Sequence, residues 1–318
     1  MTTFPEPPED DYAVLYLEDT DKPLPEKIVQ ATRYAYFKTI ARGGKSLIQS
    51  CKDMHLGRVI CYKSLLPEFA KDSIEQQRFL REARVSAMLQ HPNTVPTYEV
   101  GRDTRGNYYF TMKLVHGYTL RELLDFRDRY DLKRLFDVII QIAFALEYAH
   151  SHRVAHRDIK PENILVGPFG EVLLLDWGLA KVWDAAGHST PEDDTGGQDD
   201  SHEAPTSITG QGNLQGTATY MSPEQIRRDP NIDFRTDIFS LGVVMYEILA
   251  GRPPFEADTV AQMIAQVTDV QSQKPSDFKP PWRVPKLLEE LVMNCIEKAP
   301  EKRVQSCAEI VRLLQEDW

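Results

Sequence analysis

The sequence predicts an α+β protein with a small, strand-rich first half and a larger, mainly helical second half. Residues 33–65 form strand-like runs broken by turns, and the runs at 95–100 and 108–115 flank a turn-forming stretch, as in a hairpin. After Gly117 the apolar residues recur instead at the spacing of helices. With 318 residues, 42% of them hydrophobic, the chain is long enough to form two packed lobes.

One helix is expected within the strand-rich half, over residues 73–89. Ile74, Phe79 and Ala83 share one helical face there, and the sequence His91-Pro92-Asn93 ends the helix. Residues 238–250 are apolar almost all round, which predicts a helix buried in the centre of the second half. The other helices are expected at residues 120–126, 132–150, 261–267, 286–297 and 307–315.

Composition divides the chain into a tail, two lobes and an insert. Residues 1–30 are rich in proline and acidic residues and are expected to form a mobile tail, followed by a first lobe at 31–115 and a second lobe at 116–318. Residues 181–215 are an acidic insert of the second lobe, because no lysine or arginine occurs between Lys181 and Arg227. We expect this insert to be a flexible loop with a function.

Charge and cysteine spacing argue against several classes of protein. The net charge of −11 disfavours binding to nucleic acid and to anionic membrane surfaces. The sequence has neither a signal peptide nor a membrane-spanning apolar run, so a cytoplasmic location is expected. The four cysteines lack C-x-x-C spacing and suggest neither a zinc site nor a disulfide framework.

The strongest chemical signal is the segment Val154-Ala-His156-Arg157-Asp158-Ile-Lys160-Pro-Glu-Asn163, which matches the pattern H-R-D-x-x-x-x-N. Phosphoryl transfer needs a carboxylate that receives or orients the hydroxyl proton, and cations that balance the charge on the phosphate. Asp176 follows thirteen residues after Asn163, at the end of an apolar strand, in the sequence Asp176-Trp177-Gly178. This sequence is similar to the pattern D-F-G, with tryptophan in place of phenylalanine.

Two charged residues of the first lobe complete the set of candidate catalytic residues. Lys63 ends the strand Val59-Ile-Cys-Tyr-Lys63, which is similar to V-A-I-K, and Glu82 lies on the expected helix. An isolated lysine and glutamate would be read as a solvated surface pair. Their order before the Asp158 motif favours a functional pair instead.

With these motifs in order over about residues 33–314, the chain resembles the Hanks-type, eukaryotic-like protein kinases, and most closely their bacterial members. The resemblance implies the bilobal protein-kinase fold and transfer of the ATP γ-phosphoryl group to serine and threonine hydroxyls of proteins, its own included. Lys160 and Thr217 favour serine and threonine over tyrosine. ATP and protein substrates are the implied partners, and the implied metal ion is Mg²⁺, or Mn²⁺ in its place.

The resemblance also implies a role for each site residue. Asp158 orients the hydroxyl, Lys160 and Lys63 contact phosphates, Glu82 pairs with Lys63, and Asn163 and Asp176 hold the metal ion. Adenine is expected against Ile48, Cys61 and Leu165, beside the gatekeeper Met112 and the backbone of Lys113 and Val115. The phosphate-binding loop is Ala41, Gly43, Gly44 and Ser46, in which the first and last glycines of G-x-G-x-x-G are replaced.

Further residues are implied to support or regulate the site. Glu224, in Ser222-Pro-Glu224, is expected to pair with Arg303, while His156 and Asp237 brace the catalytic loop. Arg157 is expected to receive a phosphate placed on Thr206, Ser207 or Thr209. The altered glycine loop leaves a pseudokinase, a scaffold or weak nucleotide binder of the same fold, as the main alternative, and a small-molecule phosphotransferase as a third reading.

Overall fold

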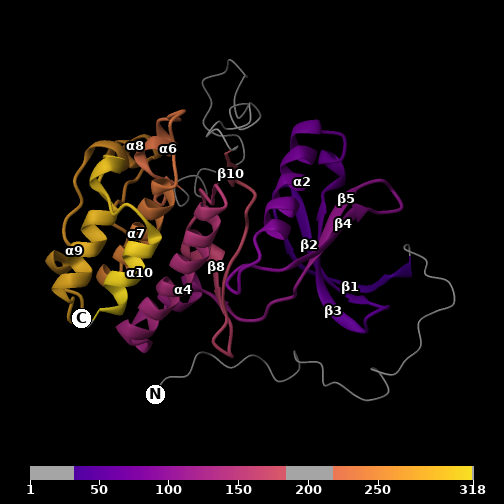
Figure 1. Cartoon of the computed structure of the whole chain (residues 1–318), viewed down its shortest axis with the longest axis horizontal. Helices are drawn as coiled ribbons and strands as arrows, with labels where there is room; N and C mark the ends of the chain where they lie inside the picture. Colours follow the sequence, from indigo (N-terminus) through magenta and orange to yellow (C-terminus); the bar gives the residue numbers. More distant parts are fainter. Residues whose placement is uncertain (1–31, 184–217, 317–318) are drawn as a thin grey trace.

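The computed structural model describes residues 32–183 and 218–316, which form two lobes joined by one connection. Figure 1 shows strands β1–β5 and helix α2 gathered in the first lobe, and helices α4 and α6–α10 in the second. The expected α+β, bilobal arrangement is therefore confirmed. The tail, most of the acidic insert, and the residues Thr206, Ser207, Thr209 and Thr217 lie outside the described residues.

The first lobe is a five-stranded antiparallel sheet in the order β1-β2-β3-β5-β4. Its strands agree with the sequence prediction, except that the strand expected to reach Val115 ends at Met112, where the chain leaves the sheet for the second lobe. The bounds are β1 Tyr34–Arg42, β2 Ser46–Asp53, β3 Arg58–Leu65, β4 Thr97–Arg102 and β5 Tyr108–Met112.

Helix α2 (Ser73–Met88) packs on this sheet and also contacts the second lobe. Asp72 caps its N-terminus by accepting the N–H of Ile74 at 2.9 Å. Phe79 packs against Phe110 of the sheet, whereas Val85 belongs to the large core of the second lobe. The helix therefore contacts both lobes.

The second lobe is built around α7 (Arg235–Ala250), in which every residue from Thr236 onward is buried. The prediction of a central helix that is apolar almost all round is confirmed. Gly251 ends α7 in the left-handed conformation at φ 72°, which glycine adopts without steric cost. The surrounding α-helices are α3 Leu120–Leu124, α4 Leu132–Ser151, α6 Pro223–Ile226, α8 Val260–Asp269, α9 Lys286–Cys295 and α10 Cys307–Gln315.

Short strands hold the loops at the junction of the lobes. β6 (Tyr118–Thr119), β8 (Ile164–Val166) and β9 (Val172–Leu174) form a three-stranded sheet, and β7 (Val154–Ala155) pairs with β10 (Lys181–Val182). The segment from His156 to Asn163 thus lies between β7 and β8, and Asp176 comes shortly after β9. The 3-10 turns are η3 Pro67–Phe69, η4 Arg127–Arg129, η5 Pro161–Asn163, η7 Pro275–Phe278 and η8 Pro300–Lys302.

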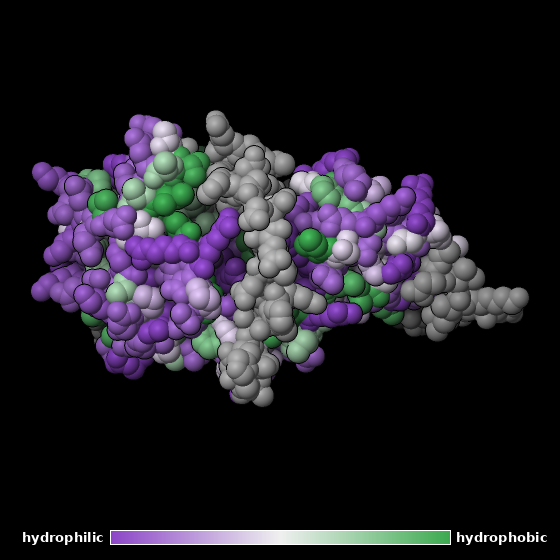
Figure 2. Space-filling model, turned by 90° about the horizontal axis from the view of Figure 1, so that it is seen from above, coloured by the Kyte–Doolittle hydropathy of each residue, from purple (hydrophilic) through white to green (hydrophobic). Residues whose placement is uncertain are grey.

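One face of the molecule is mainly polar. Figure 2 shows a largely hydrophilic face, with hydrophobic side chains in small separate patches. Within the described ranges, no helix has the length and apolar character needed to cross a membrane.

Candidate active site

Lys63 and Glu82 meet between the sheet and helix α2. Lys63 Nζ lies 2.5 Å from Glu82 Oε1, and the two side chains are 11% and 12% exposed. Desolvation lowers the pKa of Lys63, but the carboxylates of Glu82 and Asp176 outweigh it and raise the pKa above the ordinary value. Desolvation also raises the pKa of Glu82, which by itself favours a neutral pair. The Lys63 ammonium at 2.5 Å opposes that rise, and the Asp176 carboxylate keeps Lys63 charged.

The catalytic-loop motif forms a compact polar cluster around Asp158. Lys160 Nζ lies 2.9 and 2.8 Å from the two carboxylate oxygens of Asp158. The side-chain nitrogen of Asn163 donates to the Asp158 carbonyl at 2.8 Å and to its carboxylate at 2.9 Å. Desolvation raises the pKa of Asp158, and the nearby Lys160 ammonium opposes that rise. Asp158 is therefore a carboxylate suited to receiving a proton.

Asp176 lies just beyond β9 with its backbone in the left-handed region, at φ 60°. Its carboxylate accepts the N–H of Gly178 at 3.1 Å. Asp176 is exposed to solvent on one side, and the protein around it desolvates the carboxylate, an effect that by itself would raise the pKa. The Lys63 ammonium and the Gly178 N–H outweigh this effect, so the pKa of Asp176 lies below the ordinary value. The carboxylate is consequently charged and open to a ligand.

Gly178 marks the point at which the carboxylates from the two lobes approach each other. A Cβ atom built on it would lie 3.0 Å from Asp176 Oδ1 and 3.7 Å from Glu82 Oε2. Any side chain at this position would crowd the Asp176 carboxylate. The fold thus brings Lys63, Glu82 and Asp176 into one charged cluster.

Asp237 of α7 holds the catalytic loop through its backbone. One carboxylate oxygen accepts the N–H of His156 and the other that of Arg157, both at 2.8 Å. The His156 side chain lies 2.9 Å from the Leu175 carbonyl and contacts the buried Trp177, with ring centroids 4.6 Å apart. Arg157 has a positive φ of 68°, a conformation that these contacts maintain.

The apolar residues expected to contact adenine come from neighbouring strands. Cys61 of β3 pairs with Met112 of β5, and Ile48 of β2 pairs with Lys63, so these side chains lie in adjacent rows. Leu165, on β8 of the second lobe, is buried. The Lys113 N–H donates to the Pro96 carbonyl at 3.0 Å, so the Lys113 backbone can offer a ligand only its carbonyl oxygen.

The turn between β1 and β2 is well formed despite its altered sequence. The Gly43 N–H donates to the Ser46 carbonyl at 2.9 Å, and neither Gly43 nor Gly44 has a positive φ. The backbone at these two positions is therefore one that residues other than glycine also adopt without strain. Ala41 lies within β1 and Ser46 begins β2. Lys45 forms a 2.6 Å ion pair with Glu75 and joins the turn to helix α2.

Comparison with known proteins agrees with this geometry: residues 34–318 match the family model described as protein kinase domain. The chain belongs to the protein kinase family. It is 33% identical over 89% of its length to the serine/threonine-protein kinase PknD of Protochlamydia amoebophila, of which it covers 30%. It is 32% identical over 87% of its length to the serine/threonine-protein kinase PknB of Mycolicibacterium smegmatis, of which it covers 42%. The chain therefore spans less than half the length of these relatives.

The segment Ser222-Pro-Glu224 is anchored in the core of the second lobe. Arg303 forms a two-pronged pair with Glu224, at 2.7 and 2.8 Å, and its side chain has no exposed area. Ser222 caps α6, and its hydroxyl lies 2.7 Å from that of Thr236. Gln225 donates to the Arg157 carbonyl at 2.7 Å, which ties this segment to the catalytic loop.

One charged cluster of the kinase domain was not predicted. Arg121 of α3 lies 2.9 Å from Glu162 of the catalytic loop and 2.6 Å from Glu247 of α7. Tyr220 also donates to Glu247, at 2.6 Å. Only one feature of the sequence could have indicated this cluster: Glu247 is an acidic residue within a mainly apolar helix, and a buried carboxylate needs a cationic partner.

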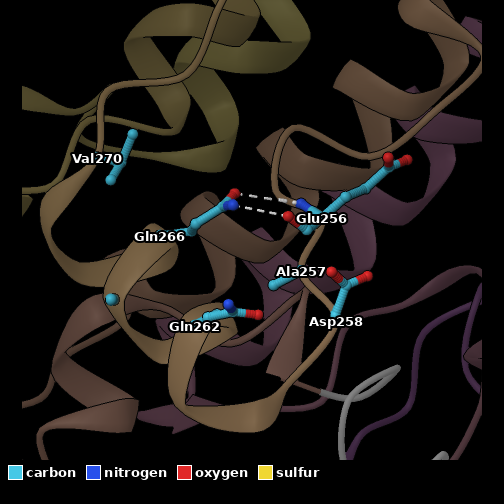
Figure 3. A pocket seen from close by; sticks show the side chains of 7 residues that line it. Glu256, Ala257, Asp258, Gln262, Gln266 and Val270 are labelled. Carbon is cyan, nitrogen blue, oxygen red and sulfur yellow. Dashed lines mark hydrogen bonds between the residues drawn. The ribbon is translucent and has the colours of Figure 1, made fainter.

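A shallow hollow on the second lobe is separate from the site. It lies between α8 and the preceding loop, where Gln266 donates to the Glu256 carbonyl at 2.7 Å (Figure 3). None of the residues that line it belongs to the charged clusters around Lys63 and Asp158. We therefore place the candidate active site at the junction of the lobes.

Proposed function

We propose that this domain transfers the γ-phosphoryl group of ATP to serine and threonine hydroxyls of protein substrates. The observation that carries the proposal is the convergence of the Lys63–Glu82 pair, the Asp158 cluster and Asp176 where the two lobes meet. Phosphoryl transfer depends mainly on positioning and electrostatic stabilisation, and this charged set can supply both.

The chain's own residues divide the work of the reaction. Asp158 accepts the proton of the attacking hydroxyl, which its raised pKa favours. Lys160 lies against the same carboxylate and balances negative charge on the transferred group. Lys63, fixed by Glu82, contacts the phosphates that remain on the nucleotide.

Asn163 and Asp176 have the chemistry of a magnesium site. The Asn163 nitrogen makes both side-chain hydrogen bonds to Asp158, which leaves the amide oxygen as the ligand atom. Asp176 adds a charged, accessible carboxylate, and oxygen donors of these types suit Mg²⁺ or Mn²⁺. A bound Mg²⁺ would neutralise phosphate charge.

Nucleotide recognition is assigned to the strands of the first lobe. Ile48, Cys61 and Leu165 supply apolar contacts for adenine, and Met112 lies behind them. The Lys113 carbonyl and the Val115 N–H supply the hydrogen bonds. The turn at residues 41–46 covers the phosphates, and its ordinary φ values support activity despite the missing glycines.

Regulation by phosphorylation is proposed for the acidic insert and the catalytic loop. Thr206, Ser207 and Thr209 are proposed as autophosphorylation sites, with Arg157 as the cation that receives the phosphate. Mass spectrometry of the intact protein after incubation with Mg-ATP tests this assignment, and an Asp158→Asn variant must remain unmodified.

The test of the function is phosphate incorporation from radiolabelled Mg-ATP into a basic protein. We expect transfer by the unaltered domain and a loss of about 10²–10⁴-fold in Asp158→Asn. Thermal unfolding with and without Mg-ATP separates the alternatives. A thermal shift without transfer would support the pseudokinase, and transfer to a small alcohol but to no protein would support a small-molecule phosphotransferase.

A further inference from the structure

Three side chains with metal-ligand chemistry meet where the end of α4 contacts the start of α10. Glu147 and His150 lie three residues apart on one face of α4, and Cys307 is the first residue of α10, which packs along α4 (Figure 1). One ligand atom from each lies within 4.8 Å of the others, and His150 Nδ1 is 4.0 Å from Cys307 Sγ. Among the residues that the structure describes, this is the one such group.

The imidazole of His150 is already oriented as in a metal ligand. Its Nε2 lies 2.8 Å from Asp237 Oδ2, and the ring stacks on Phe234 with centroids 5.1 Å apart. Because Asp237 is an acceptor, Nε2 carries the proton and Nδ1 presents a lone pair toward Cys307. A histidine that donates one ring N–H to a carboxylate while the other nitrogen faces a cation is the usual arrangement around zinc.

The other two ligands are also held in place. One oxygen of Glu147 accepts the N–H of Ala308 at 2.9 Å, and Glu147 is partly exposed, so an ion can approach from solvent. Cys307 is fully buried as the first residue of α10, and burial together with the Asp237 and Glu147 carboxylates raises the pKa of its thiol, so that the thiol proton leaves only in exchange for the metal ion. The bond to Ala308 occupies one oxygen of Glu147 and leaves the other as a ligand atom.

We propose that Glu147, His150 and Cys307 form a binding site for Zn²⁺, with water as the fourth ligand. Tetrahedral zinc with usual bond lengths places nitrogen and sulfur about 3.6 Å apart, so the pair at 4.0 Å needs to close by only about 0.4 Å. Sulfur and nitrogen donors select zinc over magnesium. Binding replaces the S–H bond by a sulfur–zinc bond and releases one proton to solvent.

The site is connected to the catalytic loop through Asp237. Zinc on Nδ1 would keep the proton on Nε2 and strengthen its hydrogen bond to Asp237, which also holds the N–H groups of His156 and Arg157. Bound zinc would therefore join α4, α7 and α10 and raise the unfolding temperature of the domain. The proposal does not depend on kinase activity.

The test is a titration of the unaltered protein with Co²⁺, as an optical probe for Zn²⁺, without nucleotide. We expect a sulfur-to-cobalt charge-transfer band in the near ultraviolet that saturates at one ion per chain and is displaced by Zn²⁺. A metal ion on Asn163 or Asp176 would give no such band, because those residues offer only oxygen. Absence of the band with Co²⁺ in excess would overturn the proposal.

Matched variants identify the thiol and the carboxylate. Cys307→Ser should abolish the band and the thermal shift with Zn²⁺, whereas Cys295→Ser, at a second buried thiol, should retain both. Glu147→Gln should keep the band but weaken affinity by at least tenfold. A band that persists in Cys307→Ser, or disappears equally in folded Cys295→Ser, would show that the ion binds elsewhere.

Discussion

The buried ion pair between Arg303 and Glu224 allows a quantitative test of the second lobe. The Arg303 guanidinium makes five hydrogen bonds, which matches its five N–H groups. Two go to Glu224, and the others go to the carbonyls of Glu297, Arg235 and Lys298 at 2.7, 2.9 and 3.0 Å. The side chains of Arg303 and Glu224 are 0% and 8% exposed. Neither charge can be hydrated if its partner is removed.

Arg303→Met should lower the free energy of unfolding by about 3–5 kcal/mol, because it leaves a buried carboxylate without its cation. For a protein of this size the change corresponds to a fall in Tm of about 6–20 °C. The double variant with Glu224→Gln should lose less than the sum of the two single losses, because the second change removes the charge that the first leaves unpaired.

Urea denaturation followed by circular dichroism measures these losses. Arg312→Met is the matched control, because Arg312 pairs with Glu316 at the surface, where the side chains are 62% and 51% exposed. The free energy of unfolding lost in Arg312→Met should stay below about 1 kcal/mol. A loss of the same small size in Arg303→Met, or strict additivity in the double variant, would refute the reasoning.

Two further predictions concern the core of each lobe. Trp177→Ala should cost about 3–5 kcal/mol of unfolding free energy, because the indole is 2% exposed, while Phe169→Ala, at a side chain 76% exposed, should cost little; equal losses in denaturant titrations would contradict this. Asp53→Asn should flatten the acid limb of stability against pH. Desolvation raises the pKa of Asp53, but Arg33 outweighs it and holds the pKa below the ordinary value. The contribution of Asp53 is therefore complete above pH about 4 and is lost as the pH falls through the lower folded pKa. The free energy of unfolding, measured with urea between pH 7 and 2, checks this prediction. Parallel pH curves for the unaltered protein and Asp53→Asn would disprove it.

The longer elements could be predicted because their apolar residues repeat at a local period. The last helix begins and ends where expected, at Cys307 and Gln315, and α4 extends one residue beyond the predicted end. Short elements could not be found in this way. β7 and β10 have two residues each, and they exist as strands because residues 154–155 and 181–182 pair across the fold.

Prediction of the site from the sequence was limited in the same way, to residues that lie within continuous motifs. Lys63, Glu82, Asp158 and Asp176 could be identified because each lies in a continuous motif that resembles one of a known family. Arg121 and Glu247 are 126 positions apart, and no local pattern relates them. The cluster of Glu147, His150 and Cys307 was missed for the same reason: cysteine spacing tests only neighbouring thiols, whereas this cluster depends on the packing of α10 against α4.

The polar residues of the buried helix α7 hold the catalytic loop and two neighbouring segments in place. A buried polar group destabilises the fold unless it is hydrogen-bonded, so each must have a partner from another segment. Asp237 holds the catalytic loop, Ser240 donates to the Tyr220 carbonyl at 2.7 Å, and Glu247 binds Arg121 of α3. The polar residues that interrupt the apolar sequence of α7 therefore bind the catalytic loop and the segments beside it. Their removal should displace the loops of the site before it unfolds the helix, which is enclosed on all sides by apolar contacts.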